Sequence, residues 1–388
     1  MAPIKVGLIG LSGAPPDKYE GVSWTPSAHL PYLLASPHYE IVALLNTSIS
    51  SGKVAAARYN LPESTKTYEN PEGKPISAYV DLVVCSVRVD SHFNTVKPSL
   101  EAGKAVFVEW PLDKNVHLAK EMSSLASKHD CRTIVGLQAS YDPVLRLLKK
   151  TIEEGRIGKV LGSSIWGSQG NGGETEVKNV RYFLDREVGG NLVILGEFEP
   201  GWQSLMSNRH EFKDIIDPAK GGEVVEKGKR NTVPDQIMFQ ATTEKDDSPV
   251  SIHLRGGATF PGTPAFEWRI QGSKGELRLT SSSANLNLGR PDMKVQTWDK
   301  GTGVVGRPGT KVELWDQGTG NVEVLEPEED EWDANEEKGF VFAVGNIARL
   351  YEAYRKGEWI PDFEWGVKRH QLIEDMWQAF DEAEAKKV

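Results

Sequence analysis

The chain has 388 residues, 39% of them hydrophobic and 26% charged, which is typical of a soluble globular protein too long for one compact core. A net charge of −10 without a basic block argues against nucleic acid and anionic membranes as partners. No apolar run reaches the length of a membrane span, and the first residues lack a signal-peptide layout. Cys85 and Cys131 lack metal-type spacing, so we expect no metal site and a cytoplasmic protein.

The chain begins with an apolar run, Ile4 to Ile9, that leads into closely spaced glycines. This pattern predicts a buried strand and a tight turn, where glycines let the backbone approach a pyrophosphate. The spacing differs from strict G-x-G-x-x-G, so an ordinary buried strand with a glycine turn remains the alternative. The residues that we assign to dinucleotide binding here are Gly7, Gly10, Leu11, Ser12 and Gly13.

A second strand is predicted over 39–46, and its end carries small polar residues instead of Asp or Glu. An acidic residue at this place would accept the adenosine ribose hydroxyls and favour NAD. Without it there is room for a ribose 2′-phosphate, so we assign Asn46 and Ser48 to the cofactor and expect NADP, with NAD as the alternative. The competing interpretation is that these residues cap the next helix.

Strands and helices alternate up to residue 138. The predicted helices cover 28–34, 53–59, 89–102 and 115–129, and the predicted strands cover 81–87, 105–109 and 132–138. This alternation predicts an α/β fold with a doubly wound parallel sheet, whose active groups gather where the strands end. The residues expected along that crevice are Ser86, Arg88, Glu109, Trp110 and Gln138, together with the glycine turn.

After about residue 141 the pattern changes to a helix over 142–154 and then separated strand-like runs with Gly- and Pro-rich turns. The runs cover 160–166, 250–255, 266–271, 276–280, 294–298 and 312–315. They predict a second, large and mostly antiparallel sheet. The acidic stretch 326–337 is interpreted as a solvated loop with a helix start, followed by helices over 339–354 and 366–385.

Several segments, each modest alone, occur in an order that resembles the Gfo/Idh/MocA (glucose–fructose oxidoreductase / inositol dehydrogenase) family, closest to its fungal galactose-repressor branch. They are Ile4–Ser12, Phe107–Leu112, Asn171–Gly173, Thr232–Asp235, Gly272–Leu277 and Val344–Tyr351. The resemblance implies a Rossmann NAD(P)-binding domain over 1–140 and an α/β substrate and oligomerisation domain over 141–388. It also implies final helices that pack back on the first domain, and homo-oligomers formed through the open sheet.

Two departures from the family pattern bear on catalysis. Family enzymes carry Glu-Lys-Pro where this chain has Glu109-Trp110-Pro111, and an indole N–H donates but does not titrate usefully. Family members also follow a Gly-Gly turn with a helix that holds a Gly-x-His-x-x-Asp element, whose histidine is the usual acid/base. After Val193 about four helical turns of that element are missing here.

The candidate catalytic residues are therefore Glu109 and Tyr182, each with a plainer interpretation. Glu109 is expected to contact the cofactor; the alternative is that it is an ordinary surface carboxylate. Tyr182 lies in the segment that reaches the pocket in relatives, but an unperturbed tyrosine pKa near 10 favours packing. Trp110 is expected to stack on the nicotinamide or a sugar ring; the alternative is that it packs between the two domains. For His92, packing or helix capping outweighs catalysis.

Two hypotheses follow. The first is an NAD(P)-dependent oxidoreductase of a sugar-like or polyol substrate, impaired by the missing helix. The second is a dinucleotide-binding regulator without catalysis, which holds a protein partner and acts in the nucleus. The first rests on the fold and the crevice, and the second rests on Trp110 and the missing histidine.

Overall fold

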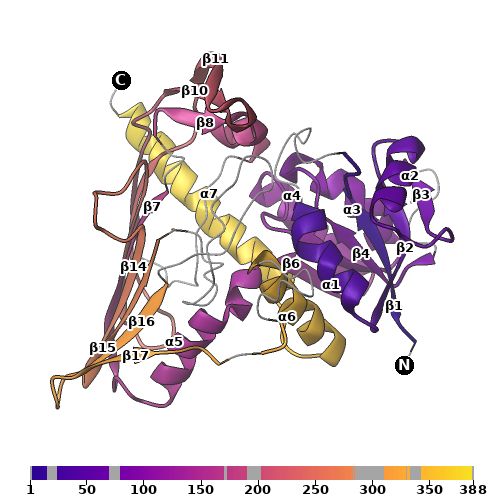
Figure 1. The fold of residues 1–388 in the computed structure, drawn as a ribbon. Helices are drawn as coiled ribbons and strands as arrows, with labels where there is room; N and C mark the ends of the chain where they lie inside the picture. Colours follow the sequence, from indigo (N-terminus) through magenta and orange to yellow (C-terminus); the bar gives the residue numbers. More distant parts are fainter. Residues whose placement is uncertain are drawn as a thin grey trace.

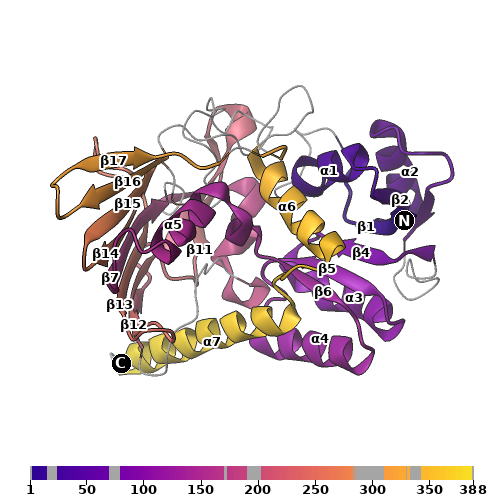
Figure 2. The ribbon, with the colours of Figure 1, turned by 90° about the horizontal axis from the view of Figure 1, so that it is seen from below.

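The computed structural model describes residues 2–14, 24–69, 79–169, 173–189, 202–282, 284, 310–328, 330–332 and 342–386. In the described part, a helix-covered parallel sheet lies beside a large sheet, and the long helix α7 runs between them (Figure 1). Figure 2 shows the same arrangement from below, with α5, α6 and α7 on the side of the large sheet that faces the parallel sheet.

The N-terminal sheet has six strands in the order β3-β2-β1-β4-β5-β6, and all its pairs are parallel. The strands are β1 (Ile4–Ile9), β2 (Tyr39–Leu45), β3 (Lys66–Tyr68), β4 (Leu82–Cys85), β5 (Ala105–Glu109) and β6 (Thr133–Gly136). Their apolar runs are buried because helices cover both faces of the sheet. The order reverses direction at β1 and β4, so the crevice opens where these two strands end.

Three of the helices up to residue 153 begin at a side-chain cap. Ser48 caps α2, Asn115 caps α4 and Asp142 caps α5, each accepting a backbone N–H. The helices are the π-helix η2 (Thr25–His29), α1 (Leu30–Ala35), α2 (Ile49–Arg58), η4 (Val89–Ser91), α3 (His92–Glu101), α4 (Val116–Lys128), η5 (Gln138–Tyr141) and α5 (Pro143–Glu153).

The C-terminal half contains an eight-stranded sheet, β17-β16-β15-β14-β7-β13-β12-β9, and a small sheet, β11-β10-β8. Its strands are β7 (Val160–Gln169), β8 (Thr175–Val177), β9 (Gln203–Ser207), β10 (Phe212–Asp217), β11 (Glu223–Arg230), β12 (Gln236–Thr242), β13 (Pro249–Gly256), β14 (Phe266–Gly272), β15 (Gly275–Ser281), β16 (Lys311–Asp316) and β17 (Val322–Leu325). The short helices are η7 (Lys178–Leu184), η8 (Arg186–Val188) and η9 (Pro218–Lys220). In the large sheet only the pair β7–β13 is parallel.

The large sheet buries one face and leaves the other open. In β15, Leu277 and Leu279 are buried while Glu276 and Arg278 alternate with them on the other face. The buried face packs against α5 and the later turns of α7.

The C-terminal helices join the two halves. Tyr351 of α6 (Phe342–Lys356) is fully buried in the core on one face of the N-terminal sheet, and Phe363 at the start of α7 (Phe363–Ala385) is buried on the other. Further along α7, Met376 and Trp377 enter the core of the large sheet. One helix therefore contributes to the cores of both halves.

The expected fold class is confirmed: a doubly wound parallel sheet is followed by a large, mostly antiparallel one. The short strand β3 and strands β8 to β12 and β17 were not predicted. In β11, charged residues alternate with few apolar ones and nearly every position is exposed, so the sequence carries no hydrophobic signal. The predicted strand over 294–298 lies outside the described residues. None of the helices described here is long and apolar enough to cross a membrane.

Replacing Phe363 by alanine should lower the free energy of unfolding by about 3–5 kcal/mol, because the ring is 1% exposed and its loss leaves a cavity against the N-terminal sheet. The matched control is Phe260→Ala, the same change at a ring that is 77% exposed, which should cost less than about 0.5 kcal/mol. Urea denaturation measures both. Equal, small effects would contradict the packing of α7 on this sheet.

Candidate functional site

The glycine turn after β1 is built for close approach. Gly10 has a φ of +95°, and a Cβ there would lie 2.8 Å from the Val87 side chain and 2.9 Å from the Ser86 carbonyl oxygen. A Cβ on Gly13 would lie 2.6 Å from the backbone nitrogen of Ala55. Only glycine lets this turn pack against β4 and α2. Leu11 is fully buried and Ser12 is half-buried, whereas Gly7 lies inside β1, three residues before the turn.

Asn46 and Ser48 follow β2 and play different parts. The Asn46 amide donates to the Leu11 carbonyl at 2.6 Å, which ties the end of β2 to the glycine turn, and its Oδ1 is buried without a partner. Ser48 is the N-cap of α2 and accepts the Ser51 N–H at 3.0 Å in a reciprocal capping box. For Ser48, the capping alternative is what the structure contains.

The turn after β4 carries Ser86 and Arg88. The Ser86 carbonyl accepts the Thr25 hydroxyl at 3.5 Å, and Arg88 forms two charge-assisted hydrogen bonds to Asp90, at 2.6 and 2.7 Å. Tyr182 of η7 lies close enough to this pair for both charges to act on its pKa. Burial raises the pKa of Tyr182, so its hydroxyl keeps its proton at neutral pH and acts as a donor, not as a base.

The turn after β5 contains a cis peptide bond between Trp110 and Pro111. It is held from two sides. The His92 ring faces the carbonyl oxygens of Val87, Pro111 and Leu112 at 3.0–3.1 Å, and the Leu112 N–H donates to His370 Nε2 at 3.1 Å.

The half-buried Trp110 ring lies 4.9 Å from the His370 ring, between centroids, so it packs against α7. His92 is buried among backbone carbonyls, which is the packing role favoured from the sequence. These contacts fix the shape of the turn that carries Glu109 into the crevice.

Glu109 at the end of β5 has a buried partner that sequence reasoning missed. Its Oε1 lies 2.8 Å from His29 Nε2, and His29 Nδ1 lies 2.9 Å from the Tyr351 hydroxyl. The side chain of His29 is 0% exposed and that of Glu109 is 13% exposed. The signal was available as a histidine on the first predicted helix, but no spacing rule links residues so far apart in the chain.

Gln138 begins η5 directly after β6. It is 8% exposed, and its Oε1 is buried without a hydrogen-bond partner. Together with Asn46 Oδ1 it gives two unpartnered acceptors at the carboxyl ends of strands of one sheet. An unsatisfied buried acceptor costs free energy unless a ligand or water supplies a donor. The glycine turn and these acceptors fit the amide, hydroxyl and phosphate groups of a dinucleotide.

Comparison with protein families agrees with this geometry. Residues 4–137 match the model described as the oxidoreductase family with an NAD-binding Rossmann fold (GFO_IDH_MocA), and residues 143–281 match the Gal80p C-terminal domain. These two matches, with the relatives described below, support a place in the Gfo/Idh/MocA family near its Gal80 branch. Because the matched family model describes an NAD-binding Rossmann fold, it supports a nicotinamide dinucleotide as the cofactor class for this crevice.

Two curated proteins that resemble this chain have different functions. The galactose/lactose metabolism regulatory protein GAL80 of Saccharomyces cerevisiae is 28% identical over 72% of this chain and 67% of its own length. The dehydrogenase aclE of Aspergillus oryzae is 25% identical over 77% of this chain and 82% of its own. The chain thus spans about two thirds of the regulator.

Solved structures show the same fold. A super-repressor mutant of Gal80p from Saccharomyces cerevisiae aligns with a TM-score of 0.77 at 23% identity, covering 97% of this chain and 95% of its own. Levoglucosan dehydrogenase in complex with NADH and L-sorbose aligns with a TM-score of 0.71 at 14% identity, covering 98% of both chains.

Asp235 lies apart from the crevice and has a structural role. The buried carboxylate of Asp235 accepts the Arg209 N–H at 3.0 Å and pairs with His210, so it fixes the turn between β9 and β10. Among the described residues, no group of three His, Cys, Asp or Glu side chains is placed to hold a metal ion.

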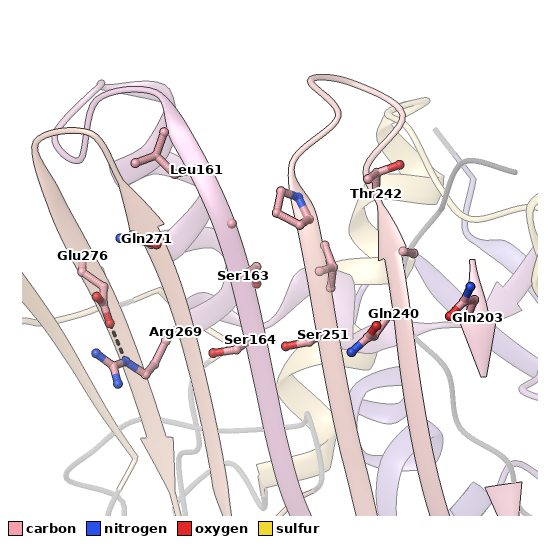
Figure 3. Close-up of a pocket in the computed structure, with 14 residues that line it drawn as sticks. Leu161, Ser163, Ser164, Gln203, Gln240, Thr242, Ser251, Arg269, Gln271 and Glu276 are labelled. Atoms are coloured by element: carbon pink, nitrogen blue, oxygen red, sulfur yellow. Dashed lines mark hydrogen bonds and ion pairs between the residues drawn. The ribbon is translucent and has the colours of Figure 1, made fainter. Parts of the chain in front are cut away.

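A broad hollow of about 860 Å³ lies on the open face of the large sheet, and Figure 3 shows residues that line it. In Figure 1, α5 and α7 lie between this sheet and the parallel sheet, so the open face points away from the parallel sheet. Its lining is mostly uncharged and polar, with Ser164, Gln240 and Ser251 side by side, and its Arg269 and Glu276 are paired with each other. The hollow offers no unpaired acid or base, so we place the candidate site in the crevice. Homo-oligomer formation through this face stays a prediction.

Replacing Gly10 by alanine should destabilise the fold by about 1–3 kcal/mol more than Gly155→Ala, because its Cβ meets the Ser86 carbonyl and the Val87 side chain. Gly155 is the matched control, since its φ is +72° and nothing lies within 4 Å of a Cβ there. Both changes share the backbone penalty for a left-handed residue. Urea denaturation curves compare them, and equal losses would mean that the turn relaxes freely.

Acid should destabilise the protein partly through His370. Burial, with the nearby charge of His92, lowers the pKa of His370 to about 4 from 6.5, and its Nε2 must stay unprotonated to accept the Leu112 N–H. Between these values the unfolded chain binds the proton and the folded chain does not. Stability is therefore lost as pH falls from about 6.5 to 4, by up to about 3 kcal/mol.

The variant His370→Gln keeps an acceptor but removes the titration, so its stability should fall less over that range. Chemical denaturation at pH 7.0, 6.0, 5.0 and 4.5 measures the difference, with His38→Gln at an exposed histidine as the control. Parallel curves for His370→Gln and the unaltered chain would exclude His370 as the titrating group.

Proposed function

We propose that this chain is an NAD(P)-dependent oxidoreductase of a sugar-like or polyol substrate, with an intact dinucleotide site and weak acid/base catalysis. The observation that carries the proposal is the pair of unpartnered acceptors at carboxyl ends of strands in the parallel sheet: Asn46 Oδ1 beside the glycine turn, and Gln138 Oε1 after β6. A nicotinamide dinucleotide bound there would supply the hydride acceptor or donor. The sugar and polyol classes come from the family resemblance and from the levoglucosan dehydrogenase neighbour.

The protein's own groups would divide the work as follows. The Gly10–Gly13 turn would hold the pyrophosphate, and Asn46 would lie beside the adenosine ribose. Glu109 and Trp110 would border the nicotinamide, and Gln138 would accept a hydrogen bond from cofactor or substrate. Tyr182 would donate a hydrogen bond to a substrate oxygen.

Weak catalysis is expected because the groups that move protons in relatives are replaced. The Trp110 indole cannot exchange a proton as the family lysine does, and the half-buried Tyr182 holds its proton. The segment in which the family histidine is expected lies outside the described residues. The same holds for Glu197 and Glu199, two carboxylates after the missing element that we propose as substitutes for the absent histidine base. General acid–base catalysis commonly contributes about 10²–10⁴ in rate.

The second candidate function is regulation by a dinucleotide-binding protein that does no chemistry. Trp110 favours it, as does the 28% identity to a galactose/lactose metabolism regulatory protein. In that case the partner would be a regulatory protein, and the protein would act in the nucleus or cytoplasm. Turnover separates the two functions.

Calorimetric titration with NAD⁺ and NADP⁺ tests the cofactor. We expect both to bind and NADP⁺ to bind more tightly, because no carboxylate follows β2 and the exposed Lys53 lies in the first turns of α2. Asn46→Asp should shift the preference towards NAD⁺ about tenfold or more relative to Asn46→Ala. Asn46→Ala is the matched control, since it loses the same bond to Leu11 without adding charge. Binding of neither dinucleotide would refute the proposal.

Activity is measured on a panel of sugars and polyols with either cofactor. The reference is a chain in which a relative's Gly-x-His-x-x-Asp segment is inserted after Val193, which should turn over about 10²–10⁴-fold faster. Equal rates in both chains would show that the missing helix is not catalytic here. Tight dinucleotide binding without turnover in either chain would favour the regulator.

A further inference from the structure

A buried histidine connects the crevice to the C-terminal helix α6. His29 lies between two side chains, with Nε2 at 2.8 Å from Glu109 Oε1 and Nδ1 at 2.9 Å from the Tyr351 hydroxyl. Its ring packs edge-on against Phe107 and Tyr351, at centroid distances of 5.0 and 5.8 Å. Of the three polar side chains, only Glu109 retains exposure, at 13%. The row of hydrogen bonds therefore ends at the crevice.

The hydrogen-bond capacities of the three groups allow a pattern in which each donor meets an acceptor. Burial raises the pKa of Tyr351 well above its ordinary value, so the phenol keeps its proton. When the phenol donates to Nδ1, His29 is a neutral imidazole with its proton on Nε2, and that N–H donates to the Glu109 carboxylate. The Glu109 carboxylate thereby gains a fixed direction.

Two further contacts restrict the same carboxylate and the same helix. A Cβ on Gly136 would collide with Glu109 Oε2, so glycine on the neighbouring strand β6 makes room for the carboxylate. His29 ends η2, and Thr25 at the start of η2 donates to the Gly10 carbonyl at 3.3 Å and the Ser86 carbonyl at 3.5 Å. A single short helix thus holds the glycine turn at one end and Glu109 at the other.

We propose that His29 is a positioning residue, which with Tyr351 holds the Glu109 carboxylate oriented to accept a hydrogen bond from an N–H or O–H group of the nicotinamide riboside. The inference rests on the proposed dinucleotide site, and it assigns a role to two residues outside the crevice. Glu109 is the group that touches the cofactor, and His29 and Tyr351 act through it.

The first experiment measures NADH binding by fluorescence titration. His29→Leu should weaken binding about tenfold, because the carboxylate loses its donor, whereas His29→Gln retains an amide donor and should lose less. In a Glu109→Gln background, His29→Leu should have little additional effect, since the two residues act as one unit. Unaltered binding by His29→Leu, or additive losses in the double variant, would overturn the assignment.

The matched control separates positioning from packing. Tyr351→Phe removes the hydroxyl that reaches His29, while Tyr39→Phe removes one that donates to the Tyr351 carbonyl at 2.7 Å in the same aromatic cluster. Both should lower stability, but only Tyr351→Phe should weaken NADH binding. Equal weakening of NADH binding by the two variants would show that Tyr351 acts only through packing, and would contradict the positioning role. These variants also replace His29→Leu if that protein fails to fold.

The second experiment needs no cofactor. Nitrogen-15 NMR of histidine-labelled protein, with His29 assigned from its loss in His29→Gln, should show a proton on Nε2 and none on Nδ1 at pH 7. Glu109→Gln should shift this signal and Tyr39→Phe should not. A proton on Nδ1 would overturn the inference.

The two experiments separate the failure modes. If the unaltered chain binds neither NADH nor NADPH, the proposed function fails, and the NMR result alone decides whether His29 orients Glu109. If the chain binds NADH and His29→Leu binds it equally well, the dinucleotide site stands and the role of His29 falls.

Discussion

The packing of the two C-terminal helices against the N-terminal sheet is the constraint on which the rest of the structure depends. Tyr351 of α6 is fully buried on one face of that sheet and Phe363 of α7 on the other. Because α7 then continues into the core of the large sheet through Met376 and Trp377, the two sheets share one hydrophobic element. The crevice has a fixed shape because its walls cannot move without disturbing these cores.

The same helices place polar groups behind the strand ends. Tyr351 reaches His29 and so supports Glu109, while His370 accepts the Leu112 N–H and supports the turn with the cis peptide bond. Family relatives that are dehydrogenases and relatives that are regulators share this architecture. The shared fold therefore does not separate the two functions. Trp110 in the crevice and the element missing after Val193 are the two departures of this chain from the pattern of the family enzymes.

The sequence predicted the N-terminal half well because its signals are strong and local. The apolar run Ile4 to Ile9, the glycine turn and the helix predicted from Asn115 each follow from a few neighbouring residues. Ser48 was assigned to the cofactor instead, and α2, which it caps, begins four residues before the predicted start at 53. Prediction from the sequence failed where the signal is distributed, as in β11, whose charged residues hide a strand exposed on both faces. The contact between His29, Glu109 and Tyr351 was beyond reach for the same reason, since it joins residues from three distant parts of the chain.

The position of Tyr351 and Phe363 in the sequence has a consequence for synthesis. The ribosome releases the chain from its N-terminus, so all six strands of the parallel sheet emerge long before the helices α6 and α7 that complete its two cores. Until the last part of the chain leaves the exit tunnel, apolar surface on both faces of the nascent sheet remains in water or in contact with a chaperone. Early termination anywhere before α6 would therefore leave an aggregation-prone fragment with exposed apolar surface. Translation has to finish before the crevice acquires its final form.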